Sequence, residues 1–355
     1  MKTAVVILNW NTKQYLERFL PGLLDSVSGM DAEVIVADSA STDGSMEMMA
    51  RVFPNVRRIV LDGNYGFTGG YNRALSLVDA DLFVLINSDI EVTPGWLGPL
   101  CEWMENHPEC GACAPKLLSY YDHSLFEYAG AAGGLVDRWC YPFCRGRVMK
   151  KVEKDEGQYD TPADVFWATG ACLMVRSSIW KSMGGLDDRF FAHMEEIDLC
   201  WRMQLEGWKI NIVPSSVVYH LGGGTLPATS PWKLKLNYRN NLLMMENNLA
   251  KTFMTDGYSI SRSMKKARAR ILERMILDGC SAAVYLLTGK GGFFTAVIEA
   301  HREYRTMRVK PNEASLCLWN QTRKAGVRVT ARYDGSIIAA AALKGKGIFK
   351  YLRSL

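Results

Sequence analysis

The sequence predicts an α/β fold built on a mostly parallel sheet with helices on both faces. Residues 1–115 alternate apolar runs such as TAVVILNW, EVIVADSA and DLFVLINSD with segments of helical periodicity. Near-continuous Val, Ile and Leu runs are typical of strands buried on both faces, with amphipathic helices between them. We expect helices at 14–27, 45–53, 71–78 and 93–106, the last with Thr93 as N-cap and Pro94 in its first turn.

The remaining sequence predicts a second half of this domain and a helical extension. Residues 120–164 are Gly-rich and aromatic, which indicates an irregular insertion that can hold a hairpin. The runs DVFWATGACLMVRSSIW and KINIVPSSVVYH then predict further strands. Beyond Pro231, long helical stretches rich in Lys, Arg and Met follow. We therefore expect one domain over 1–230, with halves 1–115 and 116–230, and a helical region over 231–355.

Composition indicates a folded globular protein with a modest net charge of +5, 48% hydrophobic and 22% charged residues. This charge suits a small anionic ligand or a membrane surface better than nucleic acid, which we do not expect as a partner. No apolar run is long enough to cross a bilayer and the N-terminus lacks a signal-peptide cleavage pattern, so a cytoplasmic location is expected.

Nine cysteines occur mostly in apolar segments, for example at Cys172, Cys200 and Cys280. We expect buried thiols in a reducing compartment and no disulfides. The pairs 110/113 and 140/144 have spacings that could bind zinc. If CGACAPKLL forms a strand, Cys113 lies within a regular element rather than in a zinc knuckle, which disfavours the zinc alternative.

Three acidic residues, Glu195, Glu196 and Asp198, begin a predicted helix that ends near Gly207. Carboxylates in a first helical turn are stabilised by unpaired backbone N–H groups and the helix dipole. Asp198 can in addition pair with Arg202 one turn later. Capping and pairing account for two acids and leave one carboxylate for another purpose.

Polar residues gather where the predicted strands end, at the edge where α/β sheets bind ligands. Asp38 follows the second strand. Because Ser41, Asp43 and Ser45 can make the hydrogen bonds of the turn or helix cap, the Asp38 carboxylate is expected to be spare for a nucleotide. Asn87 and Asp89 follow the fourth strand on one side of the chain. An oxygen-rich site there suits Mg²⁺ or Mn²⁺ bridging a diphosphate, although a turn is the alternative. 

Two glycine-rich stretches border these strand ends. GNYGFTGGYNRAL holds four glycines before a helix, so backbone can approach an anion, yet it matches neither the Walker loop nor the dinucleotide fingerprint. His220 ends a strand before three glycines and can complete a metal site, although a structural histidine is the commoner case.

Six stretches in series over residues 3–225 resemble the family 2 glycosyltransferases of the GT-A fold, most of all bacterial rhamnosyltransferase-type and polysaccharide-assembly enzymes. They are VVILNWN, VADSASTDGS, GNYGFTGGYNRAL, LINSDIE, ATGACLMVRSSIWKSMGGLDDRFFAHMEEIDLCWR and VVYHLGGGT. The resemblance implies inverting transfer of a sugar from a UDP, dTDP or GDP donor to a glycan or lipid-linked acceptor hydroxyl, assisted by Mg²⁺ or Mn²⁺.

The resemblance also assigns residue roles. Glu196 occupies the position of the catalytic base, with Glu195 in place of the second acid of the commoner Glu-Asp pair, so the choice between them stays open. Neighbouring charge and apolar side chains would raise the pKa of that base. The other implied positions are Asn9, Asp38, Asn64 and Gly66 for the nucleotide; Asn87 for ribose or a metal-bound water; Asp89 and His220 for the metal; and Trp167, Thr169 and Gly170 for the acceptor.

Arg239 and Asn240 in NYRNN match a family pattern, and Arg239 could meet the diphosphate, with a surface arginine as the equal alternative. SMKKARARILERM and KGKGIFKYLRSL mix basic and apolar residues, which suits either a membrane surface or a solvated helical subdomain. Competing functions are a non-catalytic nucleotide-sugar or glycan-binding protein, and a sugar nucleotidyltransferase, which would usually show a Gly-rich basic loop near its start.

Overall fold

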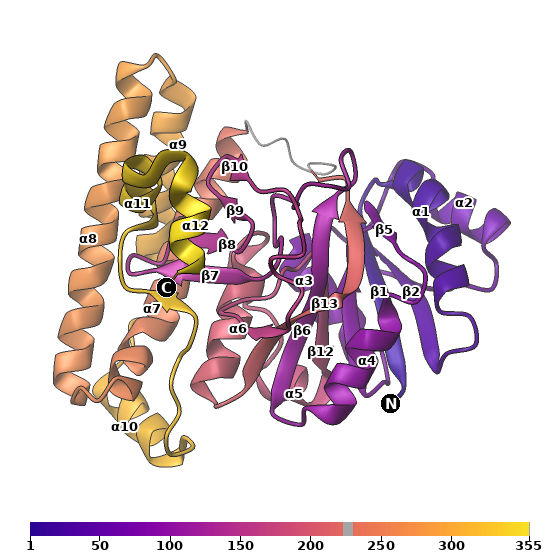
Figure 1. Ribbon diagram of the computed structural model, residues 1–355, viewed down its shortest axis with the longest axis horizontal. Coiled ribbons are helices and arrows are strands. Elements are labelled where there is room, and N and C mark those ends of the chain that lie inside the picture. The colour runs from indigo at the N-terminus through magenta and orange to yellow at the C-terminus, as the bar shows by residue number, and fades with distance from the viewer. Residues whose placement is uncertain (223–229, 355) are drawn as a thin grey trace.

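The computed structural model describes residues 1–222 and 230–354. A large twisted sheet forms its centre (Figure 1), and four of the seven neighbouring strand pairs along its main path are parallel. Strands β12 and β11 run antiparallel to their neighbours, and β5 (Ile90–Val92) pairs antiparallel with β13 beside the main path. In spatial order the strands are β11 (Ala163–Asp164), β13 (Lys209–His220), β6 (Cys110–Ser119), β12 (Cys172–Arg176), β4 (Leu82–Ile86), β1 (Thr3–Asn9), β2 (Ala32–Asp38) and β3 (Arg57–Val60).

Helices cover both faces of this sheet, as the apolar strand pattern predicts. Alternate residues of β1 show the two-sided burial: Val5 and Ile7 pack in one core, Ala4 and Val6 in the other. The first core includes α1 (Lys13–Ser26), α2 (Ser45–Val52) and α4 (Leu97–Asn106). The second includes α3 (Gly66–Ser76), α5 (Ser177–Ser182), α6 (Glu195–Leu205), and the 3₁₀ turn η1 (Asp188–Phe190).

The insertion at 120–164 forms hairpins, as expected, in a small second sheet. Its order is β10 (Lys151–Val152), β9 (Arg147–Val148), β8 (Pro142–Cys144), β7 (Gly134–Asp137) and β14 (Arg332–Tyr333). Strand β14 comes from the C-terminal region and pairs parallel with β7. The C-terminal region is therefore not purely helical, and it completes a sheet that begins in the first domain.

Long helices make up most of the C-terminal region (Figure 1). Helix α7 packs against α6, α8 and α9, which gives it a covered position between the sheet domain and the outer helices. The region comprises α7 (Pro231–Thr255), α8 (Ile260–Leu287), α9 (Gly291–Met307), α10 (Glu313–Thr322), α11 (Ile337–Lys344), η2 (Gly345–Gly347) and α12 (Ile348–Arg353).

Two predicted helix starts are wrong. Helix α4 begins at Leu97, because Thr93 and Pro94 form a turn whose carbonyl at Thr93 accepts from Trp96 N, while the Thr93 hydroxyl donates to Val217 O. Helix α3 begins at Gly66, five residues before the predicted start. The glycine-rich segment thus supplies the first turn of a helix rather than a loop before it.

Among the cysteines, Cys172 and Cys200 are buried as expected, but Cys280 is exposed on α8. Cys113 lies within β6, the strand that disfavours a zinc knuckle. Burial raises the pKa of the Cys172 thiol, which suits a packing role.

Candidate active site

The carboxyl ends of β1 and β2 meet through two buried side chains. Asn9 Nδ2 donates to Asp38 Oδ1 at 2.6 Å and to Ser41 Oγ at 3.0 Å. Asp38 Oδ2 accepts from Ser41 N at 2.9 Å. The expectation that Asp38 is spare is therefore wrong, because both of its oxygens are engaged within the chain. Asp43 does serve the turn, accepting from Ser45 N and Lys13 N.

A second polar group joins β13 to the segment after β4. His220 Nε2 lies 3.3 Å from Asp89 Oδ1, and His220 Nδ1 lies 3.2 Å from Glu127 Oε1, at an angle that makes no hydrogen bond. All three side chains are buried. Burial alone would lower the pKa of His220, but the two carboxylates outweigh it and raise that pKa to about 10. Without a metal ion the two carboxylates therefore favour the protonated imidazole, and a metal bound at Nε2 would displace that proton.

Asp89 and His220 fit a divalent cation as a pair of neighbouring ligands. Bonds of about 2.1 Å at right angles place two ligand atoms about 3 Å apart, close to the 3.3 Å between His220 Nε2 and Asp89 Oδ1. Within residues 1–222 and 230–354 no cluster of three or more His, Cys, Asp or Glu could hold a metal. Two protein ligands suit Mg²⁺ or Mn²⁺, because such ions commonly complete their shells with water and substrate phosphates. Glu127 beside Nδ1 would orient the ring.

The segment before α6 has an unusual backbone. Phe191, His193 and Met194 all have positive φ, at 64°, 71° and 73°. Non-glycine residues rarely adopt this conformation, and each costs of order 1–3 kcal/mol unless the surroundings stabilise it. Residues 190–194, which we call the 190–194 loop, lead directly into Glu195 and Glu196.

Helix α7 stabilises this loop with one buried asparagine. Asn240 Nδ2 lies within 2.7–2.9 Å of three loop carbonyls, those of Phe190, Ala192 and His193. Asn240 Oδ1 accepts from Arg239 Nε at 2.9 Å, which orients the amide. A network of this kind holds the loop in its strained conformation.

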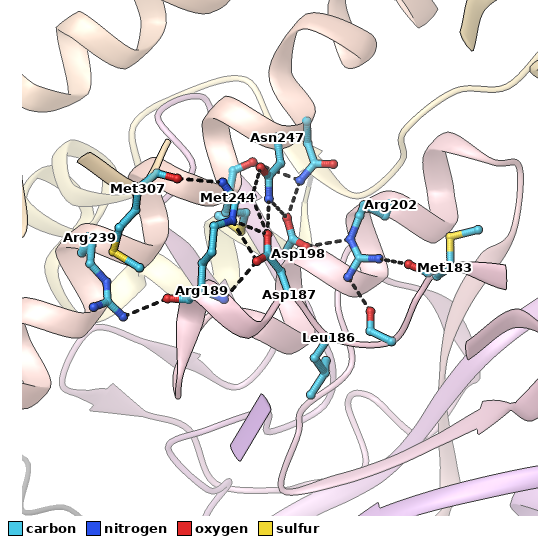
Figure 2. Close-up of polar contacts among 12 residues, drawn as sticks. Met183, Leu186, Asp187, Arg189, Asp198, Arg202, Arg239, Met244, Asn247 and Met307 are labelled. Carbon is cyan, nitrogen blue, oxygen red and sulfur yellow. Dashed lines mark hydrogen bonds and ion pairs between the residues drawn. The ribbon is translucent and has the colours of Figure 1, made fainter. Parts of the chain in front are cut away.

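Arg239 shares in the same contact. Its Nη2 donates to the carbonyls of Arg189 and Phe190, and its Nη1 pairs with Glu303 of α9 at 2.8 Å (Figure 2 shows the bond to Arg189). The side chain is 7% exposed. Arg239 is therefore buried and bound by groups of the protein itself, so it is not the surface arginine of the alternative. A contact between Arg239 and the diphosphate stays a prediction.

Glu195 is buried and Glu196 half-buried, and Oε2 of each is enclosed without a hydrogen-bond partner. Burial raises the pKa of both carboxyls, and the charge of Glu196 raises that of Glu195 further. Nearby His193 Nε2 is also buried without a partner, and burial lowers the His193 pKa to about 4. The 190–194 loop therefore leads into two carboxyls that bind protons more readily than exposed glutamates.

Backbone contacts connect these carboxyls to the strand ends. A Cβ placed on Gly66 would lie 2.5 Å from Phe191 O, so only glycine fits there, and Asn64 Oδ1 caps Gly66 N at 2.9 Å. On the other side, a Cβ on Gly170 would lie 3.6 Å from Glu196 Cβ. The next carbonyl, Ala171 O, accepts from Asn87 N at 2.9 Å. Glu196 is thus two short contacts from the segment that carries Asp89.

The other two residues expected near the acceptor are packed inside the protein. Trp167 Nε1 donates to Leu135 O at 3.1 Å, and its ring covers Gly134, where a Cβ would lie 2.0 Å away. Thr169 Oγ1 donates to Ala129 O at 2.7 Å. Both side chains are buried, so their contacts here are structural, and an acceptor role for them stays a prediction.

Asp198 has the structural role expected of it. Its carboxylate binds Arg202 Nε at 2.7 Å, as predicted, and also accepts from Asn247 and Asn248 of α7. Figure 2 shows this group continuing to Asp187, which pairs with Arg189. One of the three acids therefore fixes α6 to α7, which leaves Glu195 and Glu196 for chemistry.

Sequence reasoning missed Glu127, and it gave Asn240, which matches a family pattern, no role in this site. Glu127 lies in the irregular insertion, and no motif signals that it lies beside His220. Asn240 stood in the quoted NYRNN pattern, but its role depends on a contact between residues about fifty positions apart. The VVYHLGGGT motif ends at residues 223–225, which lie outside the described residues.

Comparisons with known proteins give the family. Residues 4–180 match the profile described as Glycosyl transferase family 2. An N-acetylglucosaminyl-diphospho-decaprenol L-rhamnosyltransferase of Mycobacterium tuberculosis is 29% identical over 231 residues, covering 61% of this chain and 75% of the relative. Rhamnosyltransferase WbbL of Escherichia coli K12 is 26% identical, covering 50% of this chain and 70% of the relative.

Solved structures show the same fold. GalNAc-T7 with UDP, GalNAc and Mn²⁺ has a TM-score of 0.54 at 15% identity over 69% of this chain, which spans 48% of that structure's chain. A mannosyltransferase of Pyrobaculum calidifontis with GDP-Man and Mn²⁺ has a TM-score of 0.50 at 13% identity, covering 86% of this chain and 87% of that one. None of the helices in the described part of the chain is long and apolar enough to span a membrane. The protein belongs to glycosyl transferase family 2, has the GT-A fold, and is a glycosyltransferase of glycan or polysaccharide biosynthesis.

Proposed function

We propose that this protein transfers a sugar, with inversion, from a nucleoside-diphosphate sugar to an acceptor hydroxyl, and that Glu196 is the base. The observation that carries the proposal is the enclosed, unpaired Oε2 of Glu196, two contacts from the Asp89 segment. In-line displacement needs a base on one side of the anomeric carbon and charge stabilisation on the other. The site supplies both kinds of group.

On the donor side, the Asn9–Asp38 pair would bind the nucleoside. The Asn9–Asp38–Ser41 bonds give a rigid, buried acidic edge at the ends of β1 and β2, where ligands of α/β sheets bind. Asn64, Gly66 and Asn87 border this edge, and Gly66 allows the backbone to approach closely.

Asp89 and His220 would hold Mg²⁺ or Mn²⁺, and the ion would stabilise negative charge on the leaving diphosphate. Mn²⁺ in the two solved GT-A structures supports this choice of ion. Glu127 keeps the His220 ring oriented from its other side.

On the acceptor side, Glu196 takes the proton of the acceptor hydroxyl at Oε2. Its raised pKa makes it a stronger base than an exposed glutamate. Asn240 and Arg239 hold the loop that sets the position of this carboxylate. They are positioning residues in this proposal.

The names of the two curated relatives support a deoxyhexose donor, rhamnose above all, and the mycobacterial name supports a lipid-linked acceptor. We propose both for this protein, with the protein peripheral to the inner face of the plasma membrane. The first property to determine is which nucleotide, UDP, dTDP or GDP, the sugar donor carries.

A thermal-shift screen tests the proposal directly. Purified protein is heated with UDP-, dTDP- and GDP-sugars, with and without Mn²⁺, alongside Asp89→Ala and a control, Asp79→Ala, which removes an exposed carboxylate before β4. We expect one donor class to raise the Tm only with the cation, in the parent and the control but not in Asp89→Ala. A shift that survives in Asp89→Ala would refute the metal assignment. The absence of any shift in folded protein would favour a non-catalytic glycan-binding function.

A further inference from the structure

Charge is divided unevenly along the chain. Residues 231–355 carry 23 Lys and Arg against 8 Asp and Glu, whereas residues 1–230 carry 19 against 29. The modest net charge of +5 therefore conceals an acidic sheet domain, at −10, and a strongly basic C-terminal region, at +15. Asymmetry of this size creates a positive potential over the outer helices.

Helix α8, the longest in this region, carries apolar side chains on its solvent face as well as on its inward face. Its buried residues are half apolar and half polar: Ala267, Ile271, Ala282, Ser263, Arg274 and Asp278. Arg274 bonds to Asn241 of α7 and to Asp278. The solvent face carries an apolar row at helical spacing, which we call the outer stripe: Leu272, Ile276, Cys280, Val284 and Leu287. Leu272 is 61%, Ile276 59% and Leu287 86% exposed. A helix packed only against its own protein typically carries polar and charged residues on its solvent face.

Basic residues lie at both ends of the outer stripe. Lys265 and Arg268 are exposed two turns and one turn before it, respectively, and Lys290 is exposed in the turn after α8. Among acidic residues along the helix, Glu273 is paired with Arg270 at 3.0 Å and Asp278 faces inward. The exposed surface of α8 is thus apolar in the middle and basic at its ends.

The upper end of the stripe lies on the same side of the molecule as the catalytic edge. The starts of α9 and α7 lie side by side, where a Cβ on Gly292 would lie 3.6 Å from Pro231 Cγ, and residues of both helices line an open cavity of about 340 Å³. Trp232, in the same turn of α7, packs its ring against Phe191 of the 190–194 loop at 5.6 Å. In Figure 1 the α8–α9 turn stands at the top of the molecule, the end toward which the arrow of β13 points.

We infer that the outer stripe of α8 and its basic ends bind an anionic lipid surface, with the α8–α9 turn toward the catalytic edge. The apolar side chains enter the interface between headgroups and acyl chains, and the basic ends bind anionic headgroups. Charge decides between a membrane and a second copy of the chain, because pairing two such faces would bring two regions of +15 together. The inference rests on the proposed function for its purpose, which is to bring the site to a lipid-linked acceptor.

Vesicle sedimentation without donor or acceptor tests the inference independently of catalysis. The intact protein is mixed with vesicles of phosphatidylcholine alone or with phosphatidylglycerol added. Two stripe variants are compared, Ile276→Glu/Leu287→Glu and Ile276→Ser/Leu287→Ser, of which the second keeps the net charge. The control Val52→Glu/Leu77→Glu changes two exposed apolar residues of the sheet domain, 51% and 60% exposed, by the same charge.

We expect the parent and the control to bind the anionic vesicles, with binding weakened by salt. Both stripe variants should bind at least about tenfold more weakly. Equal binding by the stripe variants, or no binding by the parent, would overturn the inference. A parent dimer that becomes monomeric in the stripe variants, without vesicle binding, would overturn it in favour of a second copy. Donor-induced thermal shifts on the same preparations report separately on the proposed function.

Discussion

At the scale of single residues, the two neighbouring glutamates differ in what they can do. Glu195 is buried and adds to an already crowded negative site, whereas Glu196 is half-buried beside Gly170. We expect Glu196→Gln to lower kcat by at least about a hundredfold, because a lost general base costs of order 10²–10⁴. Glu195→Gln keeps the base and should lower kcat by less than about tenfold. Steady-state rates of the two isosteric variants decide the assignment, and the opposite ranking would transfer the role to Glu195.

The same glutamates predict a pH dependence of activity. Because burial raises the pKa of Glu196 above 4.5, the base is protonated at a pH where an exposed glutamate would still be ionised. The rate should therefore fall on the acidic side through that raised pKa. A profile of kcat/KM against pH measures it. An acid limb at or below 4.5 would contradict the proposed environment.

Stability should show a complementary effect at Glu195. Its pKa is raised in the folded state, so the native state binds the proton more tightly than the unfolded chain. The contribution to stability is present below the ordinary value of 4.5 and is lost as pH rises toward the folded pKa. Glu195→Gln removes this loss, so its Tm should exceed that of the parent at about pH 8 and match it near pH 4. A Tm difference that does not change with pH would contradict this explanation.

At the scale of elements, α7 supports the active site through Asn240. Asn240→Ala leaves the carbonyls of Ala192 and His193 without the donor that Asn240 supplies, at about 1–3 kcal/mol in stability, while Phe190 O keeps its bond from Arg239. It should also release the 190–194 loop and lower kcat by more than about tenfold, with little change in donor KM. Its neighbour Asn241 is an equally buried asparagine that binds Cys140 O and Arg274 instead.

Asn241→Ala is therefore the matched control. It should lose similar stability, measured by urea unfolding, while kcat is preserved. If both variants lose kcat in proportion to their stability, Asn240 has only a structural role.

The attachment of α6 to α7 gives a second test at this scale. Asp198 is buried between Arg202 and the asparagines of α7 (Figure 2). Asp198→Ala leaves Arg202 without its carboxylate, and breaking a buried pair in this way costs about 3–5 kcal/mol. Denaturant unfolding measures the loss. A change below about 1 kcal/mol, the size expected for a surface pair, would show that the group is solvated.

The sequence predicted regular elements well where one period dominated. The strands of the main sheet can be recognised from continuous apolar runs, because both of their faces are buried. The start of α4 was misplaced because Thr93 and Pro94 carry the signals of a helix start but serve a turn bound to β13. Asp89 and His220 were predicted together through the family motifs. Glu127 was not predicted, and the NYRNN match gave Asn240 no role, because long-range contacts leave no local pattern.

At the scale of the whole molecule, the C-terminal region and the sheet domain form one structure. Strand β14 completes the small sheet beside β7, and Asp137 at the end of β7 accepts from Ile337 N at 3.0 Å. The boundary expected at residue 230 therefore marks a change in composition rather than an independent unit. Composition could not reveal the outer stripe of α8, because only the structure shows which face of that helix packs against the rest of the protein.

The order of synthesis gives the Asn240 contact a further consequence. A ribosome releases the 190–194 loop about fifty residues before the asparagine that holds it, and Glu303, which anchors Arg239, comes later still. A nascent chain can thus fold its strands while the glutamates remain unplaced. On the proposed mechanism, sugar transfer would therefore require α7 and α9, and a translation product that ends before them would consume no donor sugar.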